Sequence, residues 1–358
     1  MRRTILYYPN IEIPNNDWLR KSLLYWDEVS SIVPRSIEND LFANSSLISQ
    51  LRDEGEFRAI YPDQLMLSEV YGDFEREVIN KLKGYKRFIE RNEIASRKIL
   101  RSNSLDSFVH NEKISNRLNT ILEQMDVFSS IGDWKSFDNQ LANIYMATLA
   151  KYTALADANY TVIGTDQYDP INLMYPIKYA TKRPLLNRTP IVNLSLNILP
   201  TPMSDVPIET IIRFKRRYRE ELLSFRKQVN QFEVEISNSE SIEQIKEQLM
   251  LFKEKIEKET REAIRMLKGA RINFFLSSIK SLLDVKSPTL MATLTAFAGD
   301  RFVNLPPTVS LAGVGIAGTV DFSINYMSLN RATKEKLSDK GFLYLYHAHK
   351  GKIVKDFI

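Results

Sequence analysis

The sequence predicts an α+β protein: an N-terminal α/β domain with a parallel-type sheet and a helical insertion, followed by a long helical hairpin and a small-residue-rich C-terminal region. Three observations predict this class. Strand, helix and strand patterns alternate in the first 34 residues, two long amphipathic patterns follow residue 207, and small apolar residues dominate 287–323. Alternation of strands and helices is typical of parallel sheets.

The predicted sheet begins with a β-α-β unit. Residues 3–9 (RTILYYP) and 29–34 (VSSIVP) have the apolar character of buried strands, and residues 17–26 between them show helical spacing. Ligands of parallel sheets usually bind at the carboxyl ends of the strands. We therefore expect a ligand site near residues 8–10 and 34–36, although neither position carries a glycine-rich phosphate loop or a nucleophile elbow.

A third strand follows a short helix. Residues 45–54 form a helical pattern that ends at Gly55, which suits a C-cap. Residues 56–61 (EFRAIY) then predict a strand that Pro62 stops.

The pattern changes after the third strand. Residues 67–127 are charged, free of proline and helical in pattern, which predicts a helical insertion with an interruption near 102–107. The α/β pattern then returns with a helix over 141–156, a strand over 160–165 and a further strand over 190–196.

A proline-rich junction at 199–207 (LPTPMSDVP) divides the chain. It separates an α/β domain of residues 1–198 from a mainly helical domain of residues 208–358. In the second domain, residues 208–236 and 242–283 carry apolar stripes, and the short connection between them favours an antiparallel hairpin. A parallel coiled-coil dimer is the alternative.

Composition excludes several kinds of site. The 358 residues include no cysteine, which excludes disulfides and thiolate chemistry, and only three histidines. His347 and His349 would share a face, and offer two metal ligands, if the segment 341–347 continued as a strand. Otherwise they form a surface pair. The start of the chain lacks the apolar core of a signal peptide, so we expect a cytoplasmic protein.

The formal charge of +5 is a mild excess for this length and does not by itself indicate a partner. The densest basic cluster overlaps an apolar stripe at helical spacing, which indicates the solvated side of an amphipathic helix. The alternative is a patch that contacts nucleic-acid phosphates. The cluster consists of Arg213, Lys215, Arg216, Arg217 and Arg219.

Carboxylates are the remaining candidates for chemistry, because Mg²⁺ and Mn²⁺ take oxygen ligands. The order of helix 141–156, strand 160–165 and Asp166 resembles the late part of PIN-type nuclease domains, in which an acid at the strand end joins the metal site. Glu38, which follows VSSIVP, resembles the second acid of that family. The resemblance implies that Glu38 and Asp166 are catalytic and metal-binding residues. On the residues alone, both acids are also suited to capping helices.

A second resemblance covers nearly the whole chain. The opening RTILYYP with WLRKSLLYWDEVSSIVP, the junction LPTPMSDVPIETIIRFKRRYREELLSFR and the ending FLYLYHAHK are similar to an uncharacterised bacterial family of unknown function. This resemblance implies a bacterial cytoplasmic protein connected with antiphage or mobile-element loci. It supplies no activity, cofactor or catalytic residue.

Together these observations predict a non-catalytic interaction or regulatory protein without a cofactor. Its long charged helices offer surface for a protein partner or for self-association. One alternative is a Mg²⁺- or Mn²⁺-dependent PIN-like nuclease. Another is a membrane-acting toxin that uses residues 287–323, although Asp300, Arg301, Pro306 and Pro307 interrupt that stretch and argue against a membrane span.

Overall fold

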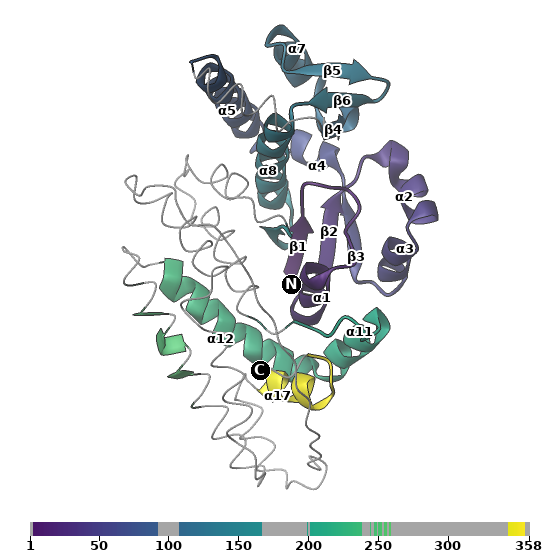
Figure 1. Ribbon diagram of the computed structural model, residues 1–358, viewed down its shortest axis with the longest axis vertical. Coiled ribbons are helices and arrows are strands. Elements are labelled where there is room, and N and C mark those ends of the chain that lie inside the picture. Colours follow the sequence, from purple (N-terminus) through teal and green to yellow (C-terminus); the bar gives the residue numbers. More distant parts are fainter. Residues whose placement is uncertain are drawn as a thin grey trace, which may run out of the picture. The chain divides into compact units, whose positions relative to one another are not determined.

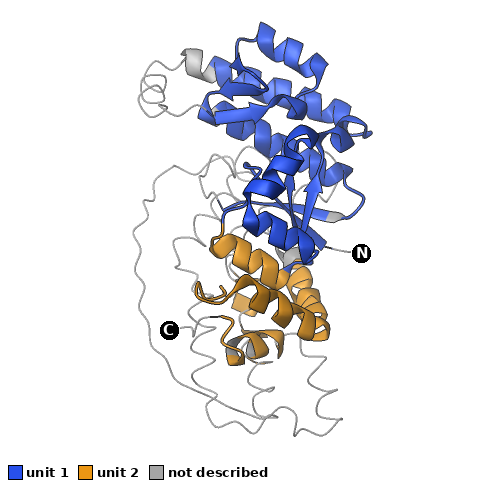
Figure 2. Ribbon diagram, turned by 90° about the vertical axis from the view of Figure 1, so that its right-hand side faces the viewer, with its two compact units in different colours: residues 1–14, 26–189 blue, residues 15–25, 190–358 orange. Residues whose placement is uncertain are grey.

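The computed structural model describes residues 3–91, 107–166, 199 and 201–237, separate positions between 244 and 258, and 343–354 (Figure 1). The chain divides into two compact units, residues 1–14 with 26–189, and residues 15–25 with 190–358 (Figure 2). The second unit thus includes helix α1 (Asp17–Tyr25), although α1 joins two strands of the first. The domain limits expected from the sequence stay a prediction.

A parallel four-stranded sheet forms the centre of the first unit, as predicted. Its strand order is β3-β2-β1-β7, and Ile5 of β1 lies opposite Val29 of β2 and Val162 of β7. Because β2 and β7 flank β1 on opposite sides, the chain reverses its direction of travel across the sheet beside β1. The strands are β1 (Arg3–Tyr7), β2 (Glu28–Ile32), β3 (Phe57–Ile60) and β7 (Tyr160–Gly164).

Short helices connect the strands on the β2 and β3 side. The predicted helix near 45–54 is present as α3 (Ser46–Asp53), and the Ser45 hydroxyl caps it by accepting the Ile48 N–H. Gly55 follows with φ +67, a conformation that glycine adopts more readily than other residues. The neighbouring elements are η1 (Arg35–Ile37), α2 (Glu38–Asn44) and α4 (Pro62–Met66).

The insertion is not helical throughout, which corrects the prediction for 67–127. It begins with α5 (Tyr71–Arg91), but residues 107–110 form a strand that pairs antiparallel with residues 134–137. A three-stranded sheet of order β4-β6-β5 results. Its elements are β4 (Ser107–His110), η2 (Asn111–Lys113), α7 (Asn116–Gln124), β5 (Phe128–Ile131) and β6 (Trp134–Phe137). The predicted interruption at 102–107 lies almost wholly outside the described residues.

One buried cluster joins the sheet to the insertion. Leu6, Ile60 and Ile163 on one sheet face belong to the same core as Phe74 of α5 and Tyr145 of α8. Helix α8 (Asn139–Ala156) corresponds to the predicted helix over 141–156 and packs against α5. The insertion is thereby tied to the sheet by continuous apolar packing.

The second unit gathers α1, α11 (Ile208–Arg217), α12 (Arg219–Ser237) and α17 (Leu343–Lys350). The sequence predicted one helix over 208–236, but it breaks at Tyr218, whose φ and ψ are −109° and 40°. The Tyr218 ring stacks on His347 with centroids 4.4 Å apart. Contact with α17 therefore accompanies the break.

Because residues 343–350 form a helix, the condition under which His347 and His349 would share the face of a strand is not met. His347 is buried, so it is not a surface residue either.

Only part of the predicted hairpin lies among the described residues. Phe232 of α12 stacks on Phe252 of the second apolar stripe, with ring centroids 4.1 Å apart. The strand over 190–196 and the small-residue region 287–323 lie outside the described residues, so those expectations stay predictions. In the described ranges, no helix is both long and apolar enough to cross a membrane.

Candidate functional site

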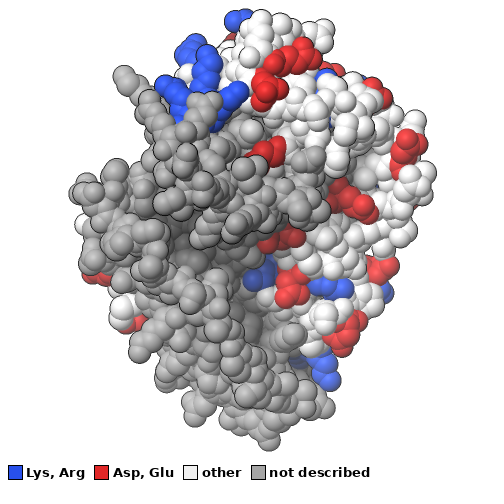
Figure 3. Space-filling view, turned by 45° about the horizontal axis from the view of Figure 1, so that its top comes forward, with Lys and Arg blue, Asp and Glu red and all other residues white. Residues whose placement is uncertain are grey.

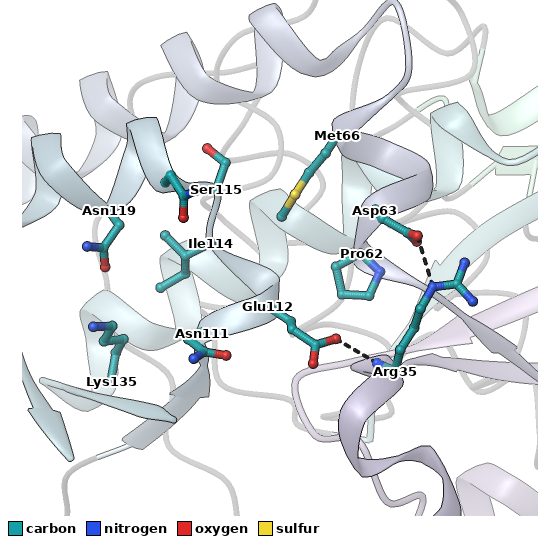
Figure 4. Close-up of a pocket in the computed structure, with 11 residues that line it drawn as sticks. Arg35, Pro62, Asp63, Met66, Asn111, Glu112, Ile114, Ser115, Asn119 and Lys135 are labelled. Atoms are coloured by element: carbon teal, nitrogen blue, oxygen red, sulfur yellow. Dashed lines mark hydrogen bonds and ion pairs between the residues drawn. The ribbon is translucent and has the colours of Figure 1, made fainter. Parts of the chain in front are cut away.

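The first unit contains a pocket of about 670 Å³ at the carboxyl edge of the parallel sheet (Figure 4). One wall follows β2 and β3, and the other belongs to the insertion. The first wall is made of Arg35, Pro62, Asp63 and Met66, and the second of Asn111, Glu112, Ile114, Ser115, Asn116, Asn119 and Lys135.

The local sequence explains the position of the first wall. Strand β2 ends at Ile32 and β3 at Ile60, so Arg35 and Pro62 both follow carboxyl ends of parallel strands. Pro62 occupies the first turn of α4, where its missing N–H costs no helical hydrogen bond. The sequence pointed to residues 34–36 as one of two expected ligand positions, and Arg35 lines the pocket. Residues 8–10 do not line it.

Arg35 is held in one orientation by two contacts. Its Nε donates to Asp63 Oδ2 at 2.9 Å, and its guanidinium carbon lies 3.9 Å from the centroid of the Tyr61 ring. Within the described part of the chain, no group accepts a hydrogen bond from Nη1 or Nη2. The guanidinium is thus fixed through Nε, and Nη1 and Nη2 remain as a fork of two donors. Two such donors can bind two oxygens of one carboxylate or phosphate group.

Glu112 connects the two walls. Its carboxylate accepts the backbone N–H groups of Arg35 at 2.7 Å and of Ser36 at 3.2 Å, across 76 or more residues of sequence. Partial burial acts to raise the pKa of Glu112, but these hydrogen bonds outweigh burial and lower it. Glu112 therefore carries a negative charge at neutral pH and fixes η2 against η1.

Lys135 supplies a second cation. Its Nζ donates to Ser130 Oγ at 2.8 Å and lies 5.0 Å from the centroid of the Phe128 ring. Figure 4 shows Lys135 and Asn119 at one end of the pocket and Arg35 at the other, with Ile114 and Pro62 between them. The pocket thus has a cation at each end, and between them lie apolar side chains together with the Glu112 carboxylate.

The two carboxylates implied by the PIN resemblance lie elsewhere. Asp166 lies two residues after the end of β7 and accepts a hydrogen bond from the Tyr7 hydroxyl at 2.8 Å. Glu38, at the start of α2, accepts one from the Tyr61 hydroxyl at 2.7 Å, and this bond raises the pKa of Tyr61. Strand β1 separates β2 from β7, so the strands that precede these acids are two spacings, or about 10 Å, apart.

Across the described ranges, no group of three or more His, Asp and Glu side chains is arranged to hold a metal ion. The roles of Glu38 and Asp166 stay predictions.

The basic cluster of the second unit divides into exposed and buried members. Arg213, Arg216, Arg217 and Arg219 are exposed, but Lys215 is only 2% exposed. The expectation that Lys215 belongs to the solvated face is wrong, because it lies one turn after Ile211 on the buried side of α11. Figure 3 shows acidic and basic side chains interspersed over the described part of one face, with a small basic group near its upper left.

The sequence analysis missed most pocket residues. Asp63 could have been found, since it follows the predicted third strand at the same edge as Arg35. Glu112 and Asn119 lie in the segment 67–127, expected to be helical with an interruption near 102–107, and no local signal brings them to the sheet edge.

A family model described as a family of unknown function (DUF6236) matches residues 84–352, which includes Glu112 and Lys135 but not Arg35. The comparison with curated proteins and the comparison with solved structures found no match.

Proposed function

Since this chain belongs to the DUF6236 family, whose function is unknown, we propose from its geometry that it is a non-catalytic binding protein whose first unit takes up a small polar ligand. The observation that carries the proposal is the pocket with the anchored Arg35 fork. A volume of about 670 Å³ lies within the range of roughly 300–1,000 Å³ that is common for small-molecule sites.

The two-sided wall supports a regulatory role. A ligand that touches both Arg35 and Lys135 would add contacts between the sheet edge and the insertion, which Glu112 already joins. Such a ligand would bind more tightly when the sheet edge and the insertion are joined than when they are apart, and it would therefore stabilise the joined arrangement. The property regulated by this ligand would be binding to a protein partner, or self-association, through the long helices of the second unit. We place this function in the cytoplasm. A connection with antiphage or mobile-element loci is part of this proposal.

Thermal melting against a panel of small polar metabolites tests the proposal. We expect at least one compound to raise the melting temperature in a concentration-dependent manner, because a ligand that binds only the folded state stabilises it. Met66→Trp is designed to fill the pocket from α4, where Met66 is partly exposed. A compound whose effect survives Met66→Trp binds elsewhere, and a panel without any effect contradicts the proposal.

A metal-dependent PIN-like nuclease is the second candidate. The observation that supports it is that Asp166 and Glu38 both follow carboxyl ends of strands in the same parallel sheet. Acids at that edge would hold Mg²⁺ or Mn²⁺, which activates water for phosphodiester hydrolysis. The test is a Mn²⁺ titration followed by melting and by cleavage of single-stranded RNA and DNA. An effect that Asp166→Asn leaves unchanged would count against this candidate.

A further inference from the structure

We infer that the ligand of the pocket is an elongated dianion, with one oxyanion group for Arg35, a second for Lys135, and an uncharged apolar spacer between them. The inference rests on the proposed function and names the chemical class of its ligand. Three observations carry it: the hydrogen-bonding capacity left at each end, the apolar side chains that lie between the two cations, and the negative charge of Glu112 beside them.

The first observation concerns Arg35. Asp63 engages only Nε, and the Tyr61 ring covers one face of the guanidinium, so the remaining donors are Nη1 and Nη2. These two nitrogens match the spacing of two oxygens of one carboxylate or phosphate. Because Asp63 and Tyr61 already contact the side chain, they reduce the rotamer entropy that Arg35 loses on binding.

The opposite end offers donors as well. Lys135 uses one of its three N–H bonds for Ser130 Oγ, and among the described residues nothing accepts the other two. The two acids of the wall, Asp63 and Glu112, accept no hydrogen bond from Nη1 or Nη2 of Arg35 or from Nζ of Lys135. Asp63 pairs with Arg35 through Oδ2, and its Oδ1 is buried away from solvent. Donors without a partner in the protein at both ends favour a ligand with acceptors at both ends.

The spacer follows from what lies between the cations. Pro62, Met66 and Ile114 supply apolar surface there. Glu112 lies in the same part of the pocket in Figure 4, and its hydrogen bonds to the η1 backbone keep it ionised. A negative group in the middle of the ligand would meet this carboxylate at close range, so Glu112 selects against it. An uncharged middle section avoids the repulsion and buries apolar area.

Carboxylate and phosphate share the chemistry that this pocket recognises. We therefore use linear α,ω-dicarboxylates of increasing length, from succinate through adipate to suberate and sebacate, and 6-phosphonohexanoate as the phosphate-like probe. Hexanoate and octanoate serve as monoanions of matched length. Isothermal titration calorimetry of the full chain in low salt measures the dissociation constant of each.

We expect a length optimum among the dicarboxylates and at least tenfold tighter binding of the best dicarboxylate than of the monoanion of equal length. Raising the salt concentration from about 50 to 500 mM should weaken binding of the dianion more than binding of the monoanion, because salt screens two charges of the dianion and one of the monoanion. Tighter binding of 6-phosphonohexanoate than of the best dicarboxylate would identify a phosphorylated acid as the natural ligand type, and the reverse order a dicarboxylate.

Substitutions assign the two ends. Arg35→Gln should weaken dianion and monoanion binding about tenfold or more, whereas Lys135→Gln should weaken only the dianion. Arg52→Gln is the matched control, since Arg52 also pairs with an aspartate, Asp53, and lies over a ring, Phe42, but does not line the pocket. It should bind like the unchanged protein.

The outcomes separate the inference from the proposed function. Equal affinity for dianions and monoanions, or a dianion effect that Lys135→Gln leaves intact, overturns the dianion class while ligand binding itself stands. Binding by another metabolite that Met66→Trp blocks, with no response to any dianion, overturns the inference alone. If nothing in either panel binds, both fail.

Discussion

The Tyr344 hydroxyl donates a hydrogen bond of 2.8 Å to the backbone carbonyl of Leu24, which lies 320 residues earlier in the chain. Both residues are buried and belong to the second unit. Leu24 is near the end of α1, where carbonyls lack helical partners. The next carbonyl, that of Tyr25, accepts from Arg226 Nε at 2.8 Å, so residues of α17 and α12 complete the end of α1.

We therefore expect Tyr344→Phe to lower the free energy of unfolding by about 1–2 kcal/mol, because the buried Leu24 carbonyl loses its partner. Urea denaturation monitored by tryptophan fluorescence measures the change. Tyr344→Leu should cost more, since it also removes the ring that packs on Phe214 and Phe225. A neutral Tyr344→Phe would show that the hydrogen bond contributes nothing.

A buried ionic cluster joins α5 to α8 in the first unit. The Glu77 carboxylate lies 2.6 Å from Lys81 Nζ and 2.6 Å from Lys151 Nζ, and it accepts the Tyr152 hydroxyl at 2.7 Å. Burial acts to raise the pKa of Glu77, but the two ammonium groups outweigh it and lower the pKa. All four residues are almost fully buried.

Glu77→Gln should cost about 3–5 kcal/mol of unfolding free energy, because two buried lysines lose their counter-charge. Asp73→Asn on the same helix is the control. Its ion pair with Arg76 is exposed, and its removal should change stability by less than about 1 kcal/mol. Similar losses for both variants in chemical denaturation would contradict the assignment of the cluster as a major contributor.

Sequence reasoning succeeded where local pattern decides structure. The parallel strands were predicted because runs such as TILYY are apolar and bounded by turn residues, and α8 because alanine and leucine favour helices. It failed for residues 107–110, where FVH becomes a strand by pairing with residues 134–137. It also missed the break at Tyr218, which accompanies packing against His347 far along the chain.

In the candidate site, too, local sequence predicts some positions and long-range pairing determines others. Arg35 and Asp63 follow strand ends, so knowledge of a parallel sheet is enough to place them at one edge. Glu112 and Lys135 reach that edge only through the β4-β6-β5 sheet, whose register sets Lys135 opposite Val109. Pairing between strands this far apart is not visible in any local window of sequence.

Replacement by alanine should change the free energy of unfolding in opposite directions at two glycines, Gly55 and Gly84. Gly55 has φ +67 at the end of α3, and nothing lies within 4 Å of an added Cβ, so Gly55→Ala tests backbone strain alone. It should lower the unfolding free energy by about 1 kcal/mol. Gly84, inside α5, has equally open surroundings, and Gly84→Ala should raise it by about 0.5–1 kcal/mol. Melting curves that shift in the same direction for both would contradict the assigned φ at Gly55.

The Lys113 side chain makes stability depend on pH in the alkaline range. Lys113 is 3% exposed, and desolvation lowers its pKa from 10.5 to about 7. Between these two values the unfolded chain holds a proton that the folded chain lacks, so stability rises with pH across this window. Below about pH 7 both states are protonated, and the folded state bears the full cost of a buried charge.

Lys113→Met should therefore stabilise the protein most at pH 6 and least near pH 10, with the difference from the unchanged protein falling by about 1.4 kcal/mol per pH unit above pH 7. The backbone carbonyl of residue 113 would keep its hydrogen bond from the Tyr145 hydroxyl, so the substitution isolates the charge. Lys83→Met, at an exposed position of α5, controls for the added apolar surface. Urea denaturation at each pH measures the difference. A gain that does not vary with pH would mean that Lys113 has the same protonation state in the folded and unfolded chains, as it would if its charged amine reached solvent in the folded protein.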